Sequence, residues 1–399
     1  MESVVIVSAV RTPVGTMGGV LRDLSAVDLA GVVLEAAVQR AGISKAMVDE
    51  VILGQAKQST DAPNIARVAS LTAGFPEEVP GYTVHRQCSS GLQAIINAVW
   101  QIQAGYGDVI VAGGVESMST APYYLRAARY GYRAGNGELL DPNTESQPRS
   151  QPESIYGSFT MGMTAENLAE QYHISREEQD EFALASHGRA VAAIDAGRFA
   201  DEVVPVTVPG PRGATTVVDT DEGPRRDTSL EKLTRLKPVF KQGGTVTAGN
   251  SSSRNDGAAA VVVMSEQRAH DLGVPPMARF VAAGIAGVNP TIMGIGPVPA
   301  TRKVLARAGL KLEDMGLIEL NEAFAAQSLA VVHELGLPRD LLNVNGGAIA
   351  LGHPLGCSGT RISVTLLHEM LRRGTRYGLA TICVAGGLGV SVIFENARA

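Results

Sequence analysis

The sequence predicts an α/β protein. Over residues 4–112, short apolar runs typical of buried strands alternate with stretches whose apolar residues recur at helical spacing, and the alternation resumes at about residue 258. Such alternation indicates strand–helix–strand crossover units and a mostly parallel sheet. Residues 117–242 are instead rich in Pro, Gly, Ser and charge, so we expect them to form an inserted subdomain that lies over the core.

The elements of the first half follow from local patterns. The run at residues 4–10 is short, β-branched and uninterrupted, which indicates a buried strand. Ser25 and Asp28 have the spacing of a capping box and precede a helical pattern. The further elements that we expect are strands over 51–53, 82–84 and 108–112 and helices over 63–73 and from just after Cys88 to about 103.

The second half echoes the first. Cys88-Ser89-Ser90-Gly91 precedes a helix, a strand and Gly113-Gly114, and Cys357-Ser358-Gly359 precedes a helix, a strand and Gly386-Gly387. If this faint repeat is real, it implies two similar βα domains whose helix N-termini converge on one site. The later elements that we expect are a helix over 177–196 and strands over 258–264, 277–283, 317–320 and 379–385.

Length and composition limit the class of protein. A chain of 399 residues suggests two or three domains, and 45% hydrophobic with 19% charged residues is typical of a globular protein. The net charge of −6 argues against nucleic acid or an anionic membrane as a partner. Three cysteines make no disulfide framework, and we find no secretory signal, membrane span, or peroxisomal or ER address. We therefore expect a cytoplasmic protein.

Cys88 is the first candidate for chemistry. An apolar segment leads into it, a helix starts directly behind it, and small residues follow, so a ligand could approach the sulfur closely. The positive end of the helix dipole and free N–H groups favour the thiolate, which is the nucleophilic form. The alternative is a small buried core cysteine, and this stretch alone leaves both interpretations open.

Three further residues are candidates. His353 lies in a glycine-rich run just ahead of a helix, which suits a neutral imidazole acting as a base, although a buried structural histidine has the same pattern. Cys383 ends a strand before flexible glycines and could reach a cavity or belong to the core. Asn321 follows a strand at the sheet edge where α/β folds place their sites, and it could also be a helix cap.

Together these stretches resemble the thiolase family over essentially the whole chain. The resemblance implies a five-layered αβαβα core of two βαβαβαββ halves, with residues 1–117 and 245–266 as the N-terminal half, 118–244 as an inserted loop domain, and 267–399 as the C-terminal half. The stretches that carry it are Arg86-Gln87-Cys88-Ser89-Ser90-Gly91, Asn321-Glu322-Ala323-Phe324, Gly352-His353-Pro354, Cys383-Val384-Ala385-Gly386-Gly387, Gly113 to Ser119, Thr247 to Asn250 and Asn255 to Ala259.

The resemblance also implies roles. Thiolases split 3-ketoacyl-CoA with free CoA to acetyl-CoA and a shortened acyl-CoA, or join two acetyl-CoA, through an acyl-cysteine. In this sequence Cys88 would carry the acyl group, His353 would take its proton, and Cys383 would move the α-proton. Asn321 and His353 would stabilise the enolate, and the backbone N–H groups of Cys88 and Ala385 would form a second oxyanion site. The family usually has glycine in place of Ala385.

CoA is the expected substrate, and no permanently bound cofactor or metal is expected. Between residues 225 and 241 six basic and two acidic side chains give 6 − 2 = +4, which suits the ADP end of CoA. Thr160 is a departure, because acetoacetyl-CoA specialists commonly have histidine there, and members without it often accept longer acyl chains. By resemblance, the residues near CoA and the acyl group are Arg225, Ser252, Ala248, Met161, Phe240, Phe324 and Thr160.

Alternatives remain at this stage. The chain could be a strict acetoacetyl-CoA thiolase, and a ketoacyl synthase would need a second histidine where Cys383 stands. A remote alternative is a structural zinc protein that uses His85, Cys88, His353 and Cys357, whose spacings are ligand-like. Thiolases are usually dimers or tetramers, so we expect a homotetramer (a dimer of dimers) or a homodimer. Fatty acid metabolism, including β-oxidation, is the expected setting.

Overall fold

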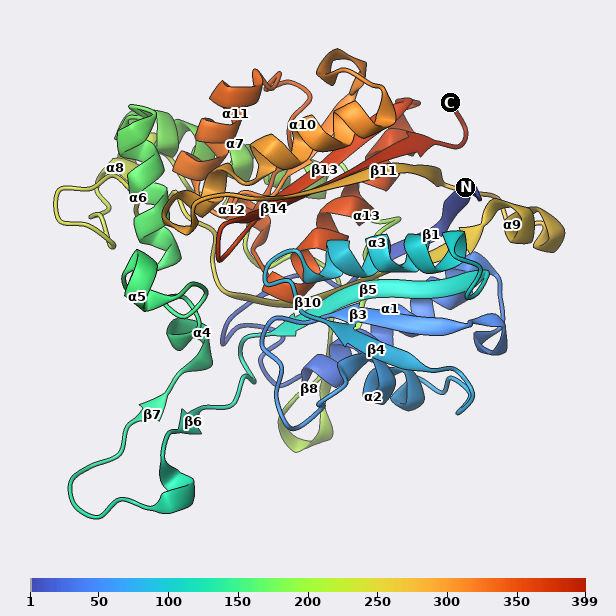
Figure 1. Cartoon of the computed structure of the whole chain (residues 1–399), viewed down its shortest axis with the longest axis horizontal. Helices are drawn as coiled ribbons and strands as arrows, with labels where there is room; N and C mark the ends of the chain where they lie inside the picture. The colour runs from blue at the N-terminus through green and yellow to red at the C-terminus, as the bar shows by residue number, and fades with distance from the viewer. Residues whose placement is uncertain (1) are drawn as a thin grey trace.

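The structure, a computed structural model, describes residues 2–399 (Figure 1). One hydrogen-bonded path joins the main strands in the order β12-β13-β14-β11-β1-β10-β5-β3-β4, and β2 pairs with β10 beside it. The strands of the path, together with β2, are β1 (Val4–Arg11), β2 (Gly15–Thr16), β3 (Glu50–Gly54), β4 (Gly81–Val84), β5 (Val109–Ser117), β10 (Asn255–Ser265), β11 (Ala278–Gly287), β12 (Leu317–Leu320), β13 (Tyr377–Val384) and β14 (Leu388–Asn396).

Two sheets in this path form a five-layered αβαβα core, as predicted. They are joined only by the pairs Val5↔Arg279 and Ile6↔Ala278 between β1 and β11. Figure 1 shows α3 and α13 between the two sheets, α1 and α2 on one outer face, and α10 and α11 on the other. These helices are α1 (Ala26–Ala41), α2 (Ile65–Thr72), α3 (Ser90–Gln103), α10 (Pro297–Ala308), α11 (Ala325–Leu335) and α13 (Leu355–Arg373).

The expected parallel character of the sheet is wrong. Among residues 2–399, only the ladders β3–β4, β3–β5 and β12–β13 are parallel, whereas β1, β10, β11 and β14 pair with their neighbours in antiparallel fashion. The sequence analysis missed β14, which returns directly from β13 through a turn at Gly386 and Gly387, both with positive φ. Alternation of strands and helices reveals crossovers, but it does not reveal strands that simply turn back.

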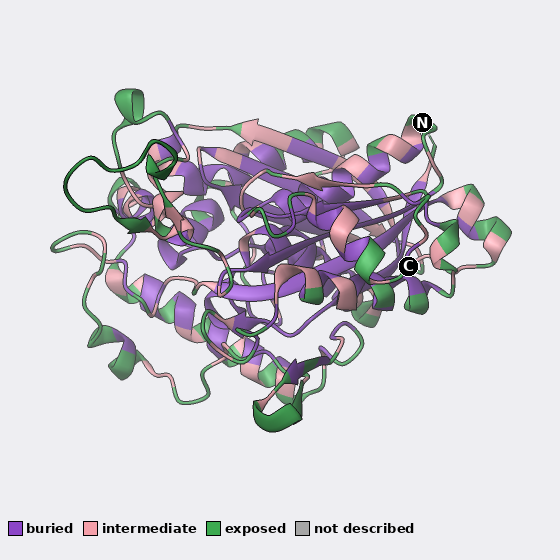
Figure 2. Ribbon diagram, turned by 90° about the horizontal axis from the view of Figure 1, so that it is seen from below, coloured by how far each residue is buried: buried purple, intermediate pink, exposed green. Residues whose placement is uncertain are grey.

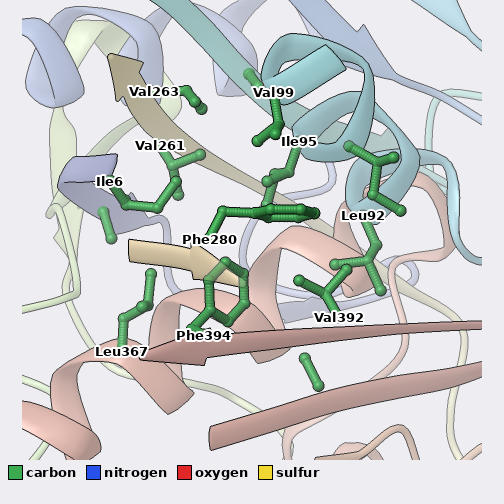
Figure 3. Packing of buried hydrophobic residues seen from close by; sticks show 14 of the residues in the cluster. Ile6, Leu92, Ile95, Val99, Val261, Val263, Phe280, Leu367, Val392 and Phe394 are labelled. Atoms are coloured by element: carbon green, nitrogen blue, oxygen red, sulfur yellow. The ribbon is translucent and has the colours of Figure 1, made fainter. Parts of the chain in front are cut away.

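One large buried cluster lies between the two sheets, and two others pack the outer helices against the outer faces of the sheets. Figure 2 shows buried residues concentrated inside the molecule and exposed residues on peripheral loops and outer helices. The aromatic rings of Phe280 and Phe394 meet edge to face, with centroids 6.3 Å apart, among aliphatic side chains from both halves (Figure 3). Since helices α3 and α13 contribute Ile95 and Leu367 to the same cluster, both halves share one central layer.

Close backbone approach defines where α3 and α13 meet. A Cβ on Gly91 would lie 2.4 Å from Thr360 Oγ1, and a Cβ on Gly359 would lie 2.5 Å from the Leu92 nitrogen. Both contacts are shorter than side chains tolerate, so the first turns of the two helices touch through glycine. The predicted convergence of two helix N-termini is confirmed.

The segment between β5 and β10 contains the predicted helix as α7 (Arg176–Asp195), begun by a capping box at Ser175. It also contains α6, whose glycine-containing start gave no clear helical pattern. Figure 1 shows the β6–β7 hairpin projecting away from the body. The elements are β6 (Tyr124–Leu125), β7 (Leu139–Leu140), α4 (Pro142–Glu145), α5 (Glu153–Tyr156), α6 (Met161–Gln171), β8 (Val206–Pro209), β9 (Thr215–Val218) and α8 (Leu230–Thr234).

Two short helices complete the fold, α9 (Glu266–Leu272) and α12 (Ala348–Leu351). Short 3₁₀ helices cover Lys45–Met47, Ala128–Tyr130, Pro211–Gly213, Pro290–Ile295 and Leu312–Asp314. Within residues 2–399 we find no helix that is long and apolar enough to cross a membrane.

The glycine contact between α3 and α13 gives a stability prediction. Gly359→Ala should lower the free energy of unfolding by about 1–3 kcal/mol, because the new methyl group overlaps the Leu92 backbone. Gly188→Ala is the matched control, since Gly188 is exposed in α7 and its new methyl group would have no atom within 4 Å. That control should be neutral or stabilising by up to about 1 kcal/mol. Thermal and denaturant unfolding measure both, and a Gly359→Ala protein as stable as the native one would contradict the prediction.

Candidate active site

Cys88 lies on a tight turn that ends just before α3. The preceding residue, Gln87, has a φ of 46°, which is unusual for a residue with a side chain. Hydroxyl groups hold this turn: Ser90 Oγ donates to the Gln87 carbonyl at 2.6 Å and Ser89 Oγ donates to the Arg86 carbonyl at 3.0 Å. The predicted position of Cys88 at the start of a helix is confirmed.

One cavity of about 200 Å³ brings candidate residues of both halves together, although Asn321 is not among its lining residues. Cys88, from the first half, shares it with His353, Cys383 and Ala385 from the second. Apolar side chains form one part of the wall, where Phe240 and Phe324 meet edge to face at 6.0 Å. The other residues that line the cavity include Lys57, Gln87, Met118, Asn143, Ser146, Gln147, Ser150, Met161, Ser252, Arg254 and Met293.

The electrostatics of Cys88 differ from expectation. Burial raises the pKa of its thiol and outweighs the opposing effects of the Ala385 N–H, the Lys57 ammonium and its own N–H. The predicted effect of backbone N–H groups at the helix start is present, and loss of water outweighs it in the resting site. The N–H groups of Cys88 and Ala385, which we predict to form an oxyanion site, both act to lower the pKa of this thiol.

His353 is arranged as a neutral base. Ser358 Oγ donates to the Pro354 carbonyl at 2.9 Å, so its 2.6 Å contact with His353 Nδ1 leaves the imidazole as the donor. This fixes the proton on Nδ1 and leaves Nε2, which is buried without a partner, as the free basic nitrogen. Burial, with a smaller effect of Arg361, lowers the pKa of His353 to about 3.

Cys383 and Asn321 stand at the ends of neighbouring parallel strands, β13 and β12. Burial raises the pKa of the Cys383 thiol, and the nearby Cys88 adds to the effect. The Asn321 side chain is fully buried with neither its nitrogen nor its oxygen partnered by protein. The capping alternative for Asn321 is wrong, because Phe324 occupies the N-cap position of α11. An unpartnered buried amide suits a bound water.

The residues expected near CoA divide between two cavities. Ser252, Met161, Phe240 and Phe324 line the cavity of Cys88, whereas Arg225 and Ala248 line a neighbouring cavity of about 380 Å³. Ser251 and Ser253 line both. Thr160 directly precedes Met161 at the start of α6, and it is among the lining residues of neither cavity.

Most of the positive charges in residues 225–241 are neutralised by acidic side chains, so the charge of this stretch is lower than the +4 counted from the sequence. Four of its cations are paired with acids: Arg226 with Asp195, Lys232 with Asp227, Arg235 with Glu231 and Lys241 with Glu170. Two of these acids lie outside the stretch, so the sequence count of +4 missed them. Within residues 2–399, Arg225 has no carboxylate at ion-pair distance, and it lines the second cavity.

The sequence analysis missed the residues that hold the site in place. Buried Glu116 accepts hydrogen bonds from the backbone N–H groups of Ala56, Lys57 and Gly356, at 2.9–3.0 Å, and so ties both halves together. Asn255 Oδ1 accepts from the His353 N–H at 2.9 Å. Both residues lie inside motifs recognised above, which were their only signal. Ser358, beside His353, was recognised only as part of a repeat.

The zinc alternative finds no support in this arrangement. His85 is exposed and Cys357 is buried in the core cluster between the sheets, away from the Cys88 cavity. Across residues 2–399 no three His, Cys, Asp or Glu side chains are grouped as ligands for a metal ion. The four residues of ligand-like spacing are therefore not brought together.

Two thiols and a neutral imidazole, converging from both halves of an αβαβα fold, define a cysteine-dependent acyltransferase. Models of the thiolase N-terminal and C-terminal domains match residues 4–267 and 274–396. An acetyl-CoA acetyltransferase of Pseudomonas aeruginosa is 51% identical over 392 residues, 98% of this chain and 99% of that protein. The chain belongs to the thiolase family.

Solved structures support the same assignment. The acetyl-CoA acetyltransferase of Bacillus anthracis has a TM-score of 0.97 and 52% identity, with 99% of both chains covered. Human mitochondrial 3-ketoacyl-CoA thiolase in complex with CoA has a TM-score of 0.94 and 45% identity, with 99% of this chain and 98% of that chain covered. The predicted family, fold and acyltransferase class are confirmed.

The hydrogen bond between His353 and Ser358 gives the second prediction. Ser358→Ala should lower kcat/KM at least about tenfold and at most by the roughly 10²–10⁴-fold that general acid–base catalysis contributes, because the tautomer of His353 is no longer fixed. Ser363→Ala is the control, since Ser363 is buried in the same helix and bonds only the Gly359 carbonyl. Steady-state thiolysis of acetoacetyl-CoA measures both. Equal effects of the two substitutions would contradict a specific role for Ser358.

Burial of His353 predicts a pH dependence of stability. Its folded pKa of about 3 lies below the ordinary value of 6.5, so the unfolded chain binds more protons between these values. The contribution of the neutral imidazole is present above pH 6.5 and is lost as the pH falls toward 3. The difference in free energy of unfolding between native protein and His353→Gln should therefore shrink from pH 7 to pH 5. A constant difference would show that His353 titrates normally in the fold.

Proposed function

We propose that the protein catalyses reversible thiolysis of 3-ketoacyl-CoA, or condensation of two acetyl-CoA, through an acyl group on Cys88. The single observation that carries this proposal is the cavity that Cys88, His353 and Cys383 share, with free His353 Nε2 as its base. Because all three groups are neutral at rest, the reaction starts with a proton transfer from Cys88 to His353 rather than from a standing ion pair.

The cleavage uses both thiols in turn. The Cys88 sulfur attacks the 3-keto carbon, the bond between carbons 2 and 3 breaks, and the departing acetyl-CoA enolate takes a proton from Cys383. The Cys383 thiolate then accepts the thiol proton of incoming CoA, whose sulfur displaces the acyl group from Cys88. The released Cys88 thiolate takes its proton back from His353. The high pKa that burial gives Cys383 makes its thiolate a strong base once formed. Condensation follows the same steps backwards.

Two groups of donors meet the developing negative charge. Protonated His353 and a water bound by Asn321 stabilise the enolate oxygen, which suits the unpartnered amide of Asn321. The N–H groups of Cys88 and Ala385 stabilise the tetrahedral oxyanion on the acyl carbon. Alanine in place of the usual glycine keeps this donor, because the N–H belongs to the backbone.

CoA spans the two neighbouring cavities in this proposal. Pantetheine passes Ser252, Met161 and Phe324, while Arg225 and Ala248 lie toward the ADP end. The human mitochondrial thiolase of the same fold has been solved in complex with CoA, which supports this assignment. We expect residues 1–117 and 245–266 to form the N-terminal half and residues 267–399 to form the C-terminal half. Residues 118–244 form the inserted domain in this division.

Chain length and setting belong to the same proposal. Thr160 in place of histidine favours acceptance of six- and eight-carbon 3-ketoacyl chains, and strict specificity for acetoacetyl-CoA is the alternative. Fatty acid β-oxidation in the cytoplasm fits such substrates, and a reducing compartment suits an enzyme that depends on two thiols. A homotetramer, or a homodimer, is supported by the projecting β6–β7 hairpin, where Tyr130 is 90% and Leu139 70% exposed.

The division of labour between the thiols gives the fourth prediction. Incubation with acetyl-CoA should acetylate Cys88 in native protein and in Cys383→Ser, as seen by mass spectrometry of the peptides. Cys383→Ser should nevertheless fail to exchange the acetyl α-hydrogens with deuterium, since the base for that proton is lost. Cys357→Ser is the matched control and should retain both activities, because its sulfur packs in the core. Label on Cys357 or Cys383, or normal exchange in Cys383→Ser, would contradict the proposal.

A loss of Asn321 should act on a different step. Asn321→Ala should leave acetylation of Cys88 possible and slow condensation by roughly 10²–10³-fold, the usual effect of one lost oxyanion donor. Separate measurements of acetylation and of acetoacetyl-CoA formation distinguish the two steps. An equal loss in both steps would argue that Asn321 supports the fold rather than the enolate.

A further inference from the structure

Lys57 is a buried cation in the Cys88 cavity. It follows β3 at the carboxyl end of that strand, and only 8% of the residue is exposed. Its Nζ donates to the Pro142 carbonyl at 3.2 Å and to Ser146 Oγ. Because an ammonium has three hydrogens, one donor remains for a ligand.

The cavity offers Lys57 no counter-ion. Its lining includes the cations Lys57 and Arg254 and no aspartate or glutamate. Two acids lie nearby. Buried Glu116 already accepts three backbone N–H groups with its two oxygens, and Asp141 pairs with Arg254 at 3.5 Å. Burial and the charge of Arg254 lower the pKa of Lys57, which the charges of Glu116, Cys88 and Asp141 oppose. A buried charge without a partner costs stability, so this ammonium is a strong site for an anion.

Polar and apolar groups occupy different parts of the wall. Met161, Phe240, Met293 and Phe324 form an apolar cluster with Cys383. Lys57 instead contacts the segment around α4, bonding Ser146 directly, and that segment adds further polar side chains to the lining. The lining residues of the segment are Asn143, Ser146, Gln147 and Ser150. The cavity therefore has an apolar wall and a separate cationic region.

We propose that Lys57 selects 3-ketoacyl-CoA substrates whose acyl chain ends in a carboxylate. This rests on the proposed thiolase reaction, in which the chain is attached to Cys88. The terminal carboxylate accepts the free N–H of Lys57 and supplies the counter-ion that the cavity lacks. A neutral chain end in the same position would remove water from the Lys57 ammonium and would supply neither a hydrogen-bond acceptor nor a counter-ion.

A different role for Lys57 predicts a different result. If its charge served only to stabilise the Cys88 thiolate, every substrate would lose activity equally when the charge is removed. The readout is therefore a ratio, namely kcat/KM for 3-ketohexanedioyl-CoA divided by kcat/KM for 3-ketohexanoyl-CoA. The two substrates differ only at the chain end, so effects on Cys88 cancel.

The experiment measures this ratio in the full-length native enzyme, in Lys57→Met and in Lys303→Met. Native enzyme should prefer the dicarboxylate, and Lys57→Met should lower the ratio roughly ten- to a hundredfold, the value of one hydrogen bond to a charged group. Lys303→Met is the matched control, because exposed Lys303 also donates to a backbone carbonyl, that of Ile285, and its ratio should equal the native one.

Several outcomes would overturn the inference. A native ratio of kcat/KM values of one or below would overturn the proposed selection without any variant. The proposal can therefore be tested even if the Lys57→Met protein fails to fold. An unchanged ratio in folded Lys57→Met would also overturn the proposal and would indicate that Lys57 acts only on the Cys88 thiolate. Failure of the thiolase proposal looks different, because native enzyme would then cleave neither substrate nor acetoacetyl-CoA and would form no acyl-Cys88.

Discussion

The contact between the first turns of α3 and α13 is the constraint on which the site depends. Gly91 and Gly359 let the two helix starts touch, and this contact brings Cys88 and His353 from separate halves to one cavity. Burying the Glu116 carboxylate beside the contact is costly, and three backbone N–H groups from both halves offset that cost. Rigid backbone, rather than flexible side chains, therefore sets the distance between the catalytic groups.

The same close packing explains the resting protonation states. Loss of water raises the pKa of both active-site thiols and lowers that of His353, so burial keeps all three neutral. Neutral groups cost less to bury than charged ones, and in the proposed reaction charge appears only when the proton moves from Cys88 to His353. The contact between Ser358 and His353 Nδ1 suits this proposal because it leaves Nε2 as the free basic nitrogen.

The features that could be predicted from the sequence are those that a few neighbouring residues determine. The helix start at Cys88, the strand end at Asn321 and the helix α7 each depend on a few adjacent residues, and all three were predictable. The link between Glu116 and Gly356 joins residues 240 positions apart, and no periodicity indicates it. The direction of the pKa shift of the Cys88 thiol could not be predicted either. It is the balance between the helix terminus and the burial of the thiol, and that burial depends on the whole fold.

The cations near the two cavities differ in a way that bears on substrate choice. The surface cations between residues 225 and 241 are mostly exposed and paired, so they cost the fold little, and salt and water screen them. Lys57 is buried and lacks an acidic partner, which costs stability without any structural gain that its neighbours reveal. Buried charges without a partner of opposite charge concentrate at functional sites, because a ligand there can supply the missing partner. Under the proposed selection, the carboxylate that a substrate brings to Lys57 separates this cavity from a purely apolar acyl pocket, whereas Thr160 lines neither cavity.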